Sequence, residues 1–250
     1  MIDTIICGDC LEVMPTIPDK SVDMVLADLP YGVTACKWDT LLPLNDLWLQ
    51  FKRLCDGAMV FTATQPFTSK LVMSQPDLFK YEMIWLKGRM SGFMNAKRAP
   101  LRNYENILVF SRAPANYSKY TPTMKYYPQM KELSAASISR YKYKFNTVNA
   151  KQYRHKKVQQ NPQQDNKFRY PDAVLKFNHD KNPSHPTQKP AALFEYLIKT
   201  YTNEGDTVLD PTAGSGTTAV ACKRNDRHYI CIEKEPEYCA IAEKRIKEML

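Results

Sequence analysis

Short apolar runs and helix-like spacings alternate along the first 112 residues of the chain. The runs are rich in β-branched or aromatic residues and predict buried strands at 4–7, 22–28, 58–64, 81–87 and 106–112. Between the first strands, residues 10–18 look helical. Residues 43–55 place apolar side chains at helical spacing, with Asn45 as the expected N-cap. This alternation predicts an α/β fold around a mainly parallel sheet.

The same alternation returns after residue 180. A helix led in by Pro190 is predicted over 187–201, then a strand over 206–210 and a turn with two glycines. A helix over 216–225, a strand over 229–233 and a last helix over 235–250 follow. The expected architecture is a doubly wound, mostly parallel, Rossmann-like sheet.

Between the two halves, residues 113–180 lose all periodicity and become basic. This segment holds 13 Lys and Arg against 4 Asp and Glu, whereas the rest of the chain has 22 of each sign. It also holds 8 of the 15 tyrosines and none of the 8 glycines. A basic, aromatic-rich insertion indicates a polyanion-binding surface, with an ordinary solvated lysine face as the alternative. Three parts are therefore expected, over 1–112, 113–180 and 181–250.

Composition limits the class of protein. A chain of 250 residues with 44% hydrophobic residues fits one large globular domain with an insertion. No apolar run approaches the 18 or so residues that a membrane span needs. The N-terminus has no basic region typical of a secretory signal, so a cytoplasmic location is expected. The seven cysteines suit reduced thiols, and Cys7 and Cys10 lack the second ligand pair of a zinc site, so no metal is expected.

Two places carry candidate chemistry. The strand over 22–28 ends on Asp28, followed by Pro30 and Tyr31, where a carboxylate is costly unless it has a task or a partner. Taken alone, this stretch also fits a plain turn after a strand.

The second place is the glycine turn after Asp210. Gly214 and Gly216 precede a helix whose N-terminus suits an anionic group. Ala219 breaks a dinucleotide fingerprint, and Thr217 stands where a phosphate-binding loop for ATP would need lysine. Glu233, at the end of the next strand, matches the acid that holds ribose hydroxyls in such folds.

Three motifs in this order, ADLPYG at 27–32, HPTQKP at 185–190 and DPTAGSGT at 210–217, resemble one enzyme family. The chain is similar to the S-adenosylmethionine-dependent amino-methyltransferases of DNA, in the permuted group called beta class. The resemblance implies a methyltransferase sheet with a recognition insertion, and base flipping of the target. Leu29 departs from the motif, because most members have proline there.

The resemblance implies a role for each motif. Asp28 and the carbonyl of Leu29 would accept the two amine hydrogens, Pro30 would stiffen the turn, and Tyr31 would stack on the base. Lys189 with Thr187 would approach the cofactor carboxylate. Residues expected at the cofactor are Asp9, Cys10, Asp28, Thr187, Lys189, Asp210, Pro211, Ala213, Gly214, Ser215, Gly216, Thr217 and Glu233. Residues expected at DNA are Arg140, Lys142, Lys144, Lys151, Arg154, Lys156, Lys157, Lys167 and Arg169.

An acid at the first motif position favours N6 of adenine as the methylated atom. N4 of cytosine, an RNA substrate and a non-catalytic DNA-binding homologue stay open as alternatives. Double-stranded DNA is the expected partner, and a homodimer and a cognate restriction endonuclease are left open.

Overall fold

The structure is a computed structural model that describes residues 2–32, 40–113, 124–133, 167–180 and 188–249. The chain forms two compact units, one of Met1–Tyr127 with Ala173–Leu250 and one of Pro128–Asp172.

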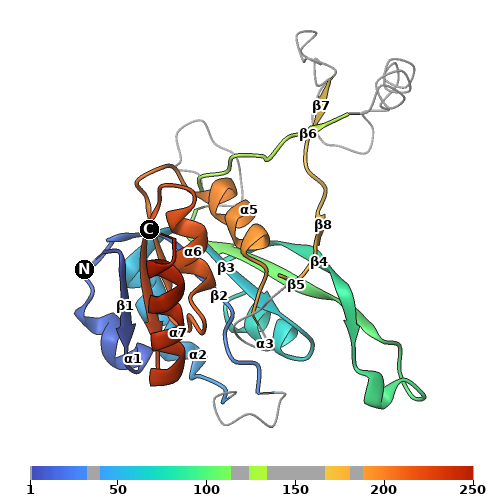
Figure 1. Cartoon of the computed structure of the whole chain (residues 1–250), viewed down its shortest axis with the longest axis horizontal. Helices are drawn as coiled ribbons and strands as arrows, with labels where there is room; N and C mark the ends of the chain where they lie inside the picture. The colour runs from blue at the N-terminus through green and yellow to red at the C-terminus, as the bar shows by residue number, and fades with distance from the viewer. Residues whose placement is uncertain (1, 33–39, 114–123, 134–166, 181–187, 250) are drawn as a thin grey trace. The chain divides into compact units, whose positions relative to one another are not determined.

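The larger unit is built on one eight-stranded sheet (Figure 1). Its strand order is β1-β10-β9-β2-β3-β5-β4-β8. Neighbouring strands run parallel, except that β5 is antiparallel to both β3 and β4. The strands are β1 (Thr4–Cys7), β2 (Val22–Ala27), β3 (Cys55–Ala63), β4 (Phe79–Ser91), β5 (Arg102–Ser111), β8 (Val174–Phe177), β9 (Thr207–Asp210) and β10 (His228–Glu233).

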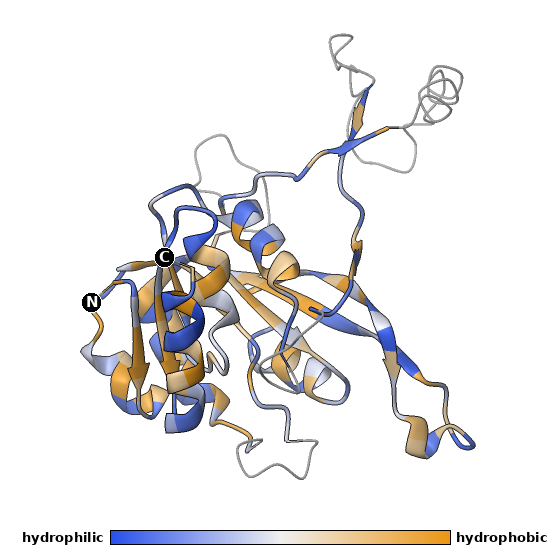
Figure 2. Cartoon of the chain, viewed as in Figure 1, coloured by the Kyte–Doolittle hydropathy of each residue, from blue (hydrophilic) through white to orange (hydrophobic). Residues whose placement is uncertain are grey.

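Helices cover both faces of this sheet, because its central strands are apolar on both sides (Figure 2). In β2, Val25 and Ala27 pack under α1, α2 and α3, whereas Met24 and Leu26 pack under α5 and α6. The last helix, α7, contacts β1, β10 and α6. The helices are α1 (Cys10–Val13), α2 (Leu44–Leu54), α3 (Phe67–Ser74), α5 (Ala191–Tyr201), α6 (Thr217–Lys223) and α7 (Pro236–Lys247), with short 3-10 turns η1 (Met14–Thr16) and η2 (Phe93–Asn95). The predicted doubly wound, mostly parallel fold is confirmed.

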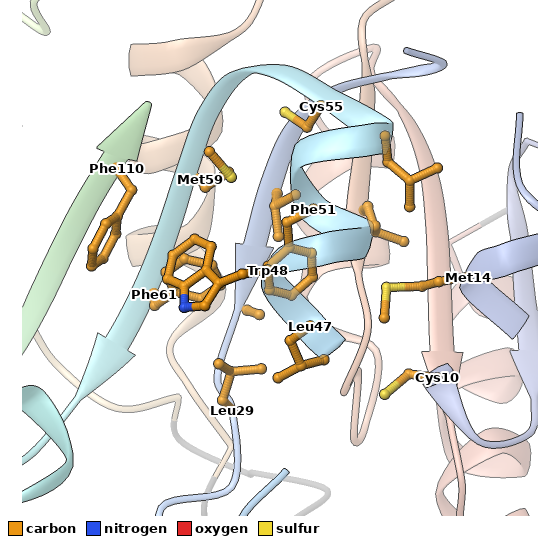
Figure 3. Close-up of a cluster of buried hydrophobic side chains, with 14 of the residues drawn as sticks. Cys10, Met14, Leu29, Leu47, Trp48, Phe51, Cys55, Met59, Phe61 and Phe110 are labelled. Carbon is orange, nitrogen blue, oxygen red and sulfur yellow. The ribbon is translucent and has the colours of Figure 1, made fainter. Parts of the chain in front are cut away.

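Aromatic rings hold the first of these faces together (Figure 3). Trp48 of α2 lies 5.0 Å from Phe110 and 5.6 Å from Phe61, measured between ring centroids. Its indole N–H donates to the hydroxyl of Ser74 at 2.8 Å, which satisfies the polar atom that burial would otherwise leave unpaired. The side chain of Leu29, 3% exposed, belongs to the same cluster. The residue that departs from the family motif therefore contributes to the core.

Most predicted elements of this unit are found within three residues of their expected bounds. The prediction that Asn45 caps α2 is wrong, because the helix begins at Leu44 directly after Pro43. The helix α3 and the edge strand β8 were not predicted. Among the described residues, no helix is long and apolar enough to cross a membrane.

The smaller unit contains a short antiparallel pair, β6 (Lys131–Glu132) and β7 (Phe168–Arg169). Asp172 accepts hydrogen bonds from Lys131 at 3.1 Å and from Arg169 at 2.9 Å, which ties the two strands to the residues that follow. This unit lies inside the basic 113–180 segment, whose assignment to DNA recognition stays a prediction.

Candidate active site

The candidate site lies where the winding of the sheet reverses. The chain leaves β2 toward β3 and leaves β9 toward β10, so the two helical connections diverge from adjacent strands. In doubly wound sheets the crevice at the carboxyl ends of such strands is where ligands bind. A cavity of about 360 Å³ opens there.

Residues from both strand ends line this cavity. The lining includes all four residues of the Asp28–Tyr31 motif and most of those predicted at the cofactor. The predicted cofactor residues found in the lining are Asp9, Cys10, Asp28, Lys189, Asp210, Pro211, Ala213, Gly214, Ser215, Thr217 and Glu233.

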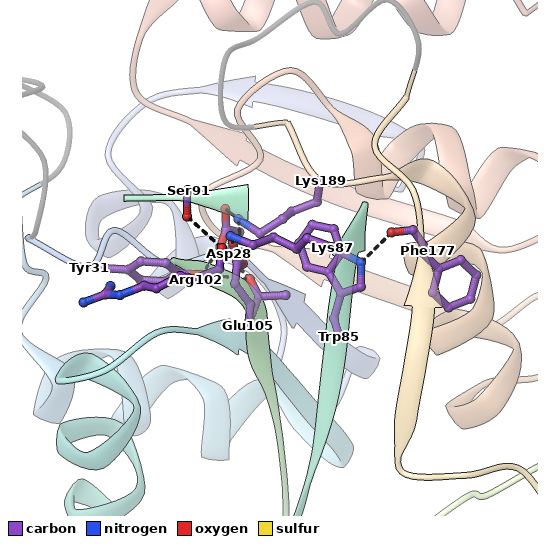
Figure 4. Close-up of polar contacts among 10 residues, drawn as sticks. Asp28, Tyr31, Trp85, Lys87, Ser91, Arg102, Glu105, Phe177 and Lys189 are labelled. Atoms are coloured by element: carbon purple, nitrogen blue, oxygen red, sulfur yellow. Dashed lines mark hydrogen bonds and ion pairs between the residues drawn. The ribbon is translucent and has the colours of Figure 1, made fainter. Parts of the chain in front are cut away.

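The carboxylate of Asp28 is held by donors from three separate segments (Figure 4). Its Oδ1 accepts from the hydroxyls of Tyr31 and Thr62, both at 2.5 Å. Its Oδ2 accepts from the ammonium of Lys189, also at 2.5 Å. Short charge-assisted bonds on both oxygens fix the orientation of this carboxylate at the cavity wall.

Lys189 bridges Asp28 to a second buried acid. Its Nζ lies 3.5 Å from Oε2 of Glu105, whose other oxygen accepts from Lys87 at 3.0 Å. Oε2 has no hydrogen-bond partner among the described residues, so Lys189 is the charge that balances it. Burial alone would lower the pKa of Lys189, but the two carboxylates outweigh it and raise this pKa. The ammonium therefore stays charged inside the protein.

Two residues to which the family resemblance gives a role toward a ligand have partners inside the protein in this structure. Lys189 was expected at the cofactor carboxylate, whereas here its ammonium pairs with Asp28 and Glu105. Tyr31 was expected to stack on a base, and its ring stacks on Phe67 with centroids 5.3 Å apart. Burial, followed by the charge of Asp28, raises the pKa of Tyr31 well above its usual value, so its hydroxyl remains a donor.

The glycine turn after β9 is braced by two acids. Asp210 accepts from the backbone N–H of Thr212 at 3.1 Å and from the hydroxyl of Thr218. Glu233 accepts from the backbone N–H of Gly214 at 2.7 Å. Burial raises the pKa of Asp210 to about 7. The turn is thus shaped by carboxylates that also line the cavity.

The two glycines of this turn have different reasons to lack a side chain. Both have positive φ, +52° for Gly214 and +76° for Gly216, where side chains are strained. A Cβ on Gly216 would lie 2.7 Å from Cβ of Ala242, so this glycine lets α7 approach. Gly214 faces open space and lines the cavity, whereas Gly216 is not part of the lining.

Asp9 and Cys10, which are expected at the cofactor, also line the cavity. Asp9 caps α1 by accepting from the N–H of Leu11 at 2.9 Å, and this bond contributes most to lowering its pKa. Burial raises the pKa of the Cys10 thiol to about 11, which keeps it protonated. In the part of the chain that the structure describes, no three His, Cys, Asp or Glu side chains gather in a way that could hold a metal ion.

Other residues predicted at the cofactor or at DNA lie either outside the described residues or in the smaller unit. Thr187 lies outside the described residues, as do Arg140, Lys142, Lys144, Lys151, Arg154, Lys156 and Lys157. Lys167 and Arg169 belong to the smaller unit, where Arg169 pairs with Asp172.

Thr62, Lys87 and Glu105 were missed by the sequence reasoning. Glu105 carried a usable signal, since it precedes the apolar run of β5. Because β5 is antiparallel, its first residues lie at the edge where the parallel strands end.

Comparison with known proteins identifies relatives over almost the whole chain. The profile of a family described as DNA methylase matches residues 22–244. A DNA adenine methyltransferase of Escherichia coli K12, YhdJ, is 30% identical over 97% of this chain and 82% of its own length. The type II methyltransferase M.HpaI of Haemophilus parainfluenzae is 25% identical over 97% of this chain and 73% of its own.

Solved structures give the same picture of the fold. A complex of M1.HpyAVI with SAM is 26% identical, with a TM-score of 0.61 and coverage of 97% of this chain and 98% of that one. The cytosine-N4-specific PvuII DNA methyltransferase aligns with a TM-score of 0.63 over 97% of this chain and 85% of its own. At 18% identity, this second likeness shows the fold alone.

Proposed function

The chain belongs to the DNA methylase family of amino-methyltransferases, and from that premise we propose that it methylates N6 of adenine in double-stranded DNA. The methyl donor is S-adenosylmethionine, and the target adenine leaves the base stack to reach the site.

One observation carries this proposal. The cavity at the sheet reversal joins the Asp28 carboxylate to the glycine turn in a single space. A methyl donor bound at the turn and an amine bound by Asp28 would therefore lie in contact inside one cavity, with no protein atoms between them. Holding both reactants in one oriented site is a large part of what such a transfer requires.

The residues of the cavity fit this donor by their chemistry. Glu233 would take the ribose diol, because each carboxylate oxygen can accept a second hydrogen bond beside its backbone N–H. Asp9 and Cys10 would lie along the adenine, and buried Asp210 would favour a positively charged group. Bound there, S-adenosylmethionine supplies an electrophilic methyl group on a sulfonium.

The chain's own residues prepare the amine. Asp28 accepts one N–H of the target amine and the Leu29 carbonyl accepts the other, which turns the nitrogen lone pair toward the donor. Because Lys189 occupies Oδ2 of Asp28, the amine shares this oxygen or displaces the ammonium toward Glu105. Tyr31 and Thr62 keep Oδ1 in place meanwhile, and the proton that the methylated amine loses goes to Oδ2.

Adenine is favoured over cytosine on two grounds. The first motif residue is an acid, Asp28. The relative YhdJ, 30% identical, is named a DNA adenine methyltransferase. The cytosine-specific structural neighbour bears only on the fold at its 18% identity.

The function is tested by incubating the protein with isotopically labelled S-adenosylmethionine and duplex DNA, followed by digestion to nucleosides and mass analysis. Labelled N6-methyladenine is expected, and the Asp28→Asn variant, which keeps the size of the side chain, should transfer none. Finding only N4-methylcytosine would contradict the choice of base. Transfer to RNA but not to DNA, assayed in parallel, would contradict the substrate class.

The cellular setting is proposed by analogy. Type II methyltransferases of Haemophilus parainfluenzae and Haemophilus influenzae are 25% and 26% identical to this chain. We infer a partner restriction endonuclease that recognises the same sequence. We also propose that the 113–180 segment recognises that DNA sequence.

A further inference from the structure

The hairpin that joins β4 to β5, residues 87–102, extends past the sheet on both sides. On one side β3 ends at Ala63, opposite Asn106, and on the other β8 ends at Phe177, opposite Lys87. Every residue from 88 to 100 is exposed. The hairpin projects away from the body of its unit (Figure 1). A two-stranded ribbon of this kind contributes nothing to the core and is only marginally stable by itself, which suggests a role in binding.

The hairpin is basic and carries no acid. It holds five Lys and Arg residues and no Asp or Glu. Of these five, Lys87 is the one that pairs with an acid among the described residues, and that acid is Glu105. The other four, Arg89, Lys97, Arg98 and Arg102, form no ion pair with any residue in the described ranges. Unopposed positive charge on an exposed ribbon fits a polyanion.

The tip of the hairpin is apolar as well as exposed. Met90, Phe93 and Met94 expose 54%, 66% and 100% of their surface. Figure 2 shows hydrophobic residues at this tip among hydrophilic ones. Charged residues would suffice to keep an exposed ribbon soluble, so large apolar side chains here indicate a partner that covers them.

The base of the hairpin is joined directly to the candidate site. Lys87 of β4 pairs with Glu105 of β5, and Glu105 faces Lys189, which holds Asp28 (Figure 4). Whatever the hairpin binds is therefore close to the atoms that would act on the target amine. A base taken out of a duplex leaves a gap, and apolar side chains are the groups that proteins insert between base steps.

We propose that the 87–102 hairpin is a second DNA-contact element, separate from the 113–180 segment. Arg89, Lys97, Arg98 and Arg102 bind backbone phosphates, and Phe93 with Met94 enters the duplex beside the flipped base. This inference rests on the proposed function, since it takes duplex DNA as the substrate.

The charge part is tested with the full-length variant Arg89→Gln, Lys97→Gln, Arg98→Gln and Arg102→Gln. Its matched control, Lys70→Gln, Lys199→Gln, Lys244→Gln and Lys247→Gln, removes four exposed charges elsewhere. Binding to a labelled random-sequence duplex is measured over a range of salt concentrations. The slope of log Kd against log salt should shrink by about 3.6 in the hairpin variant, since each of the four phosphate contacts contributes about 0.9.

A slope equal to that of the control variant would overturn the charge part of the proposal. The affinity for S-adenosylmethionine, measured by calorimetry, should be the same in the wild type and both variants. If the fourfold variant loses cofactor binding, two double variants take its place. They are Arg89→Gln with Arg102→Gln and Lys97→Gln with Arg98→Gln, and the slope of log Kd against log salt is measured for each.

The apolar tip is tested with Phe93→Ser and Met94→Ser together. Its control is Leu49→Ser with Met73→Ser, two side chains that are also exposed, at 66% and 72%. The tip variant should keep the salt slope but lose methyl transfer to duplex DNA by about tenfold, because unstacking would go uncompensated. Transfer equal to that of the control would overturn the insertion of the tip.

The wild-type protein distinguishes a failure of the proposed function from a failure of the hairpin proposal. A wild-type protein that neither binds nor methylates duplex DNA would contradict that function. A wild-type protein that does both, with hairpin variants equal to their controls, would contradict the hairpin alone.

Discussion

At the scale of single residues, the site depends on an alternating chain of charges, from Lys87 through Glu105 and Lys189 to Asp28. The side chains of Lys189 and Glu105 are only 8% and 11% exposed. Buried ions are costly to desolvate, and each one is tolerated because its neighbours carry the opposite sign. Removing one member should therefore affect the fold as well as the chemistry.

Replacing Lys189 with methionine should lower the free energy of unfolding by about 3 kcal/mol, because the nearly buried Glu105 and the partly buried Asp28 lose their shared cation. Adding Asp28→Asn to this variant should recover part of that stability, because Lys189 is the cation that pairs with Asp28, whereas Glu105 still has Lys87. Urea denaturation measures both, with Lys199→Met on the exposed side of α5 as the control. Equal stability of Lys189→Met and wild type would show that the charges do not support one another.

Half of this residue-level arrangement could be predicted from the sequence. Asp28, Asp210 and Glu233 each stand at the carboxyl end of an apolar strand, and parallel strands bring such ends to one edge. Thr62 and Glu105 could not be found in this way. Thr62 is a neutral residue one position before the end of β3, and Glu105 lies in the first half of β5, whose reversed direction becomes known only from its pairing.

Asp210 should make stability depend on pH. Its pKa of about 7 in the fold lies above the unfolded value of 3.8, so between these values the folded state holds a proton that the unfolded chain has released. Stability should then fall as pH rises through this window, by up to about 1.4 kcal/mol per pH unit.

The Asp210→Asn variant should lack this fall, because an amide does not titrate in this range. Its oxygen can still accept from the Thr212 N–H and its NH₂ can donate to the Thr218 hydroxyl, so the turn should keep its shape. Urea denaturation from about pH 5 to pH 8 should show the variant gaining on the wild type as pH rises. Parallel stability curves for the two proteins would contradict the raised pKa.

At the scale of elements, the glycine turn between β9 and α6 meets two demands at once. Its backbone must turn sharply at the cavity, and α6 must allow α7 to pack closely against it. Gly214 serves the first and Gly216 the second, as the open space beside one and the Ala242 side chain beside the other indicate.

Gly216→Ala should be clearly more destabilising than Gly214→Ala, although both place a side chain at positive φ. The strain is common to both, about 1 kcal/mol or more, and only the first adds an overlap with Ala242. Thermal denaturation ranks the two, and Gly214→Ala should instead weaken cofactor binding. Ala242→Gly added to Gly216→Ala should relieve the overlap but not the strain, and no recovery of stability would place the cause elsewhere.

The elements that sequence patterns predicted are the apolar ones at the centre of the sheet. The helix α3 was missed because Thr68, Ser69, Lys70 and Ser74 leave it little apolar periodicity. The strand β8 was missed because it is short, and only one of its four residues is buried. Both gain their order from neighbours that are distant in sequence, which local patterns do not record.

At the scale of the whole molecule, the positive charge is divided between two places. The 113–180 segment carries the entire net excess of the chain. The hairpin carries five more positive residues that acids elsewhere offset in the total. A count of net charge therefore reveals the first place and hides the second.

Neutralising Lys151, Arg154, Lys156 and Lys157 with glutamine should weaken duplex binding and flatten its salt dependence, by up to about 0.9 in slope for each phosphate that the variant no longer binds. Cofactor affinity should not change, because the described residues that line the cavity all come from 8–42 and 188–238. Fluorescence anisotropy over a salt series checks the first expectation and calorimetry the second. An unaltered slope would remove this stretch from the DNA-binding surface.

The order of strands in the sheet also governs how the chain can fold. The first strand, β1, pairs with β10, where Thr4 lies opposite Ile230, and β2 meets its neighbour β9 only at Val208 and Leu209. A growing chain can assemble β2, β3, β5 and β4 early, while β1 waits until β10, residues His228–Glu233, has been made. Closing such distant pairs is slow because of the loop entropy involved. In pulse-labelled hydrogen exchange, the amides of β3 and β5 should gain protection before those of β1, so the candidate site forms last.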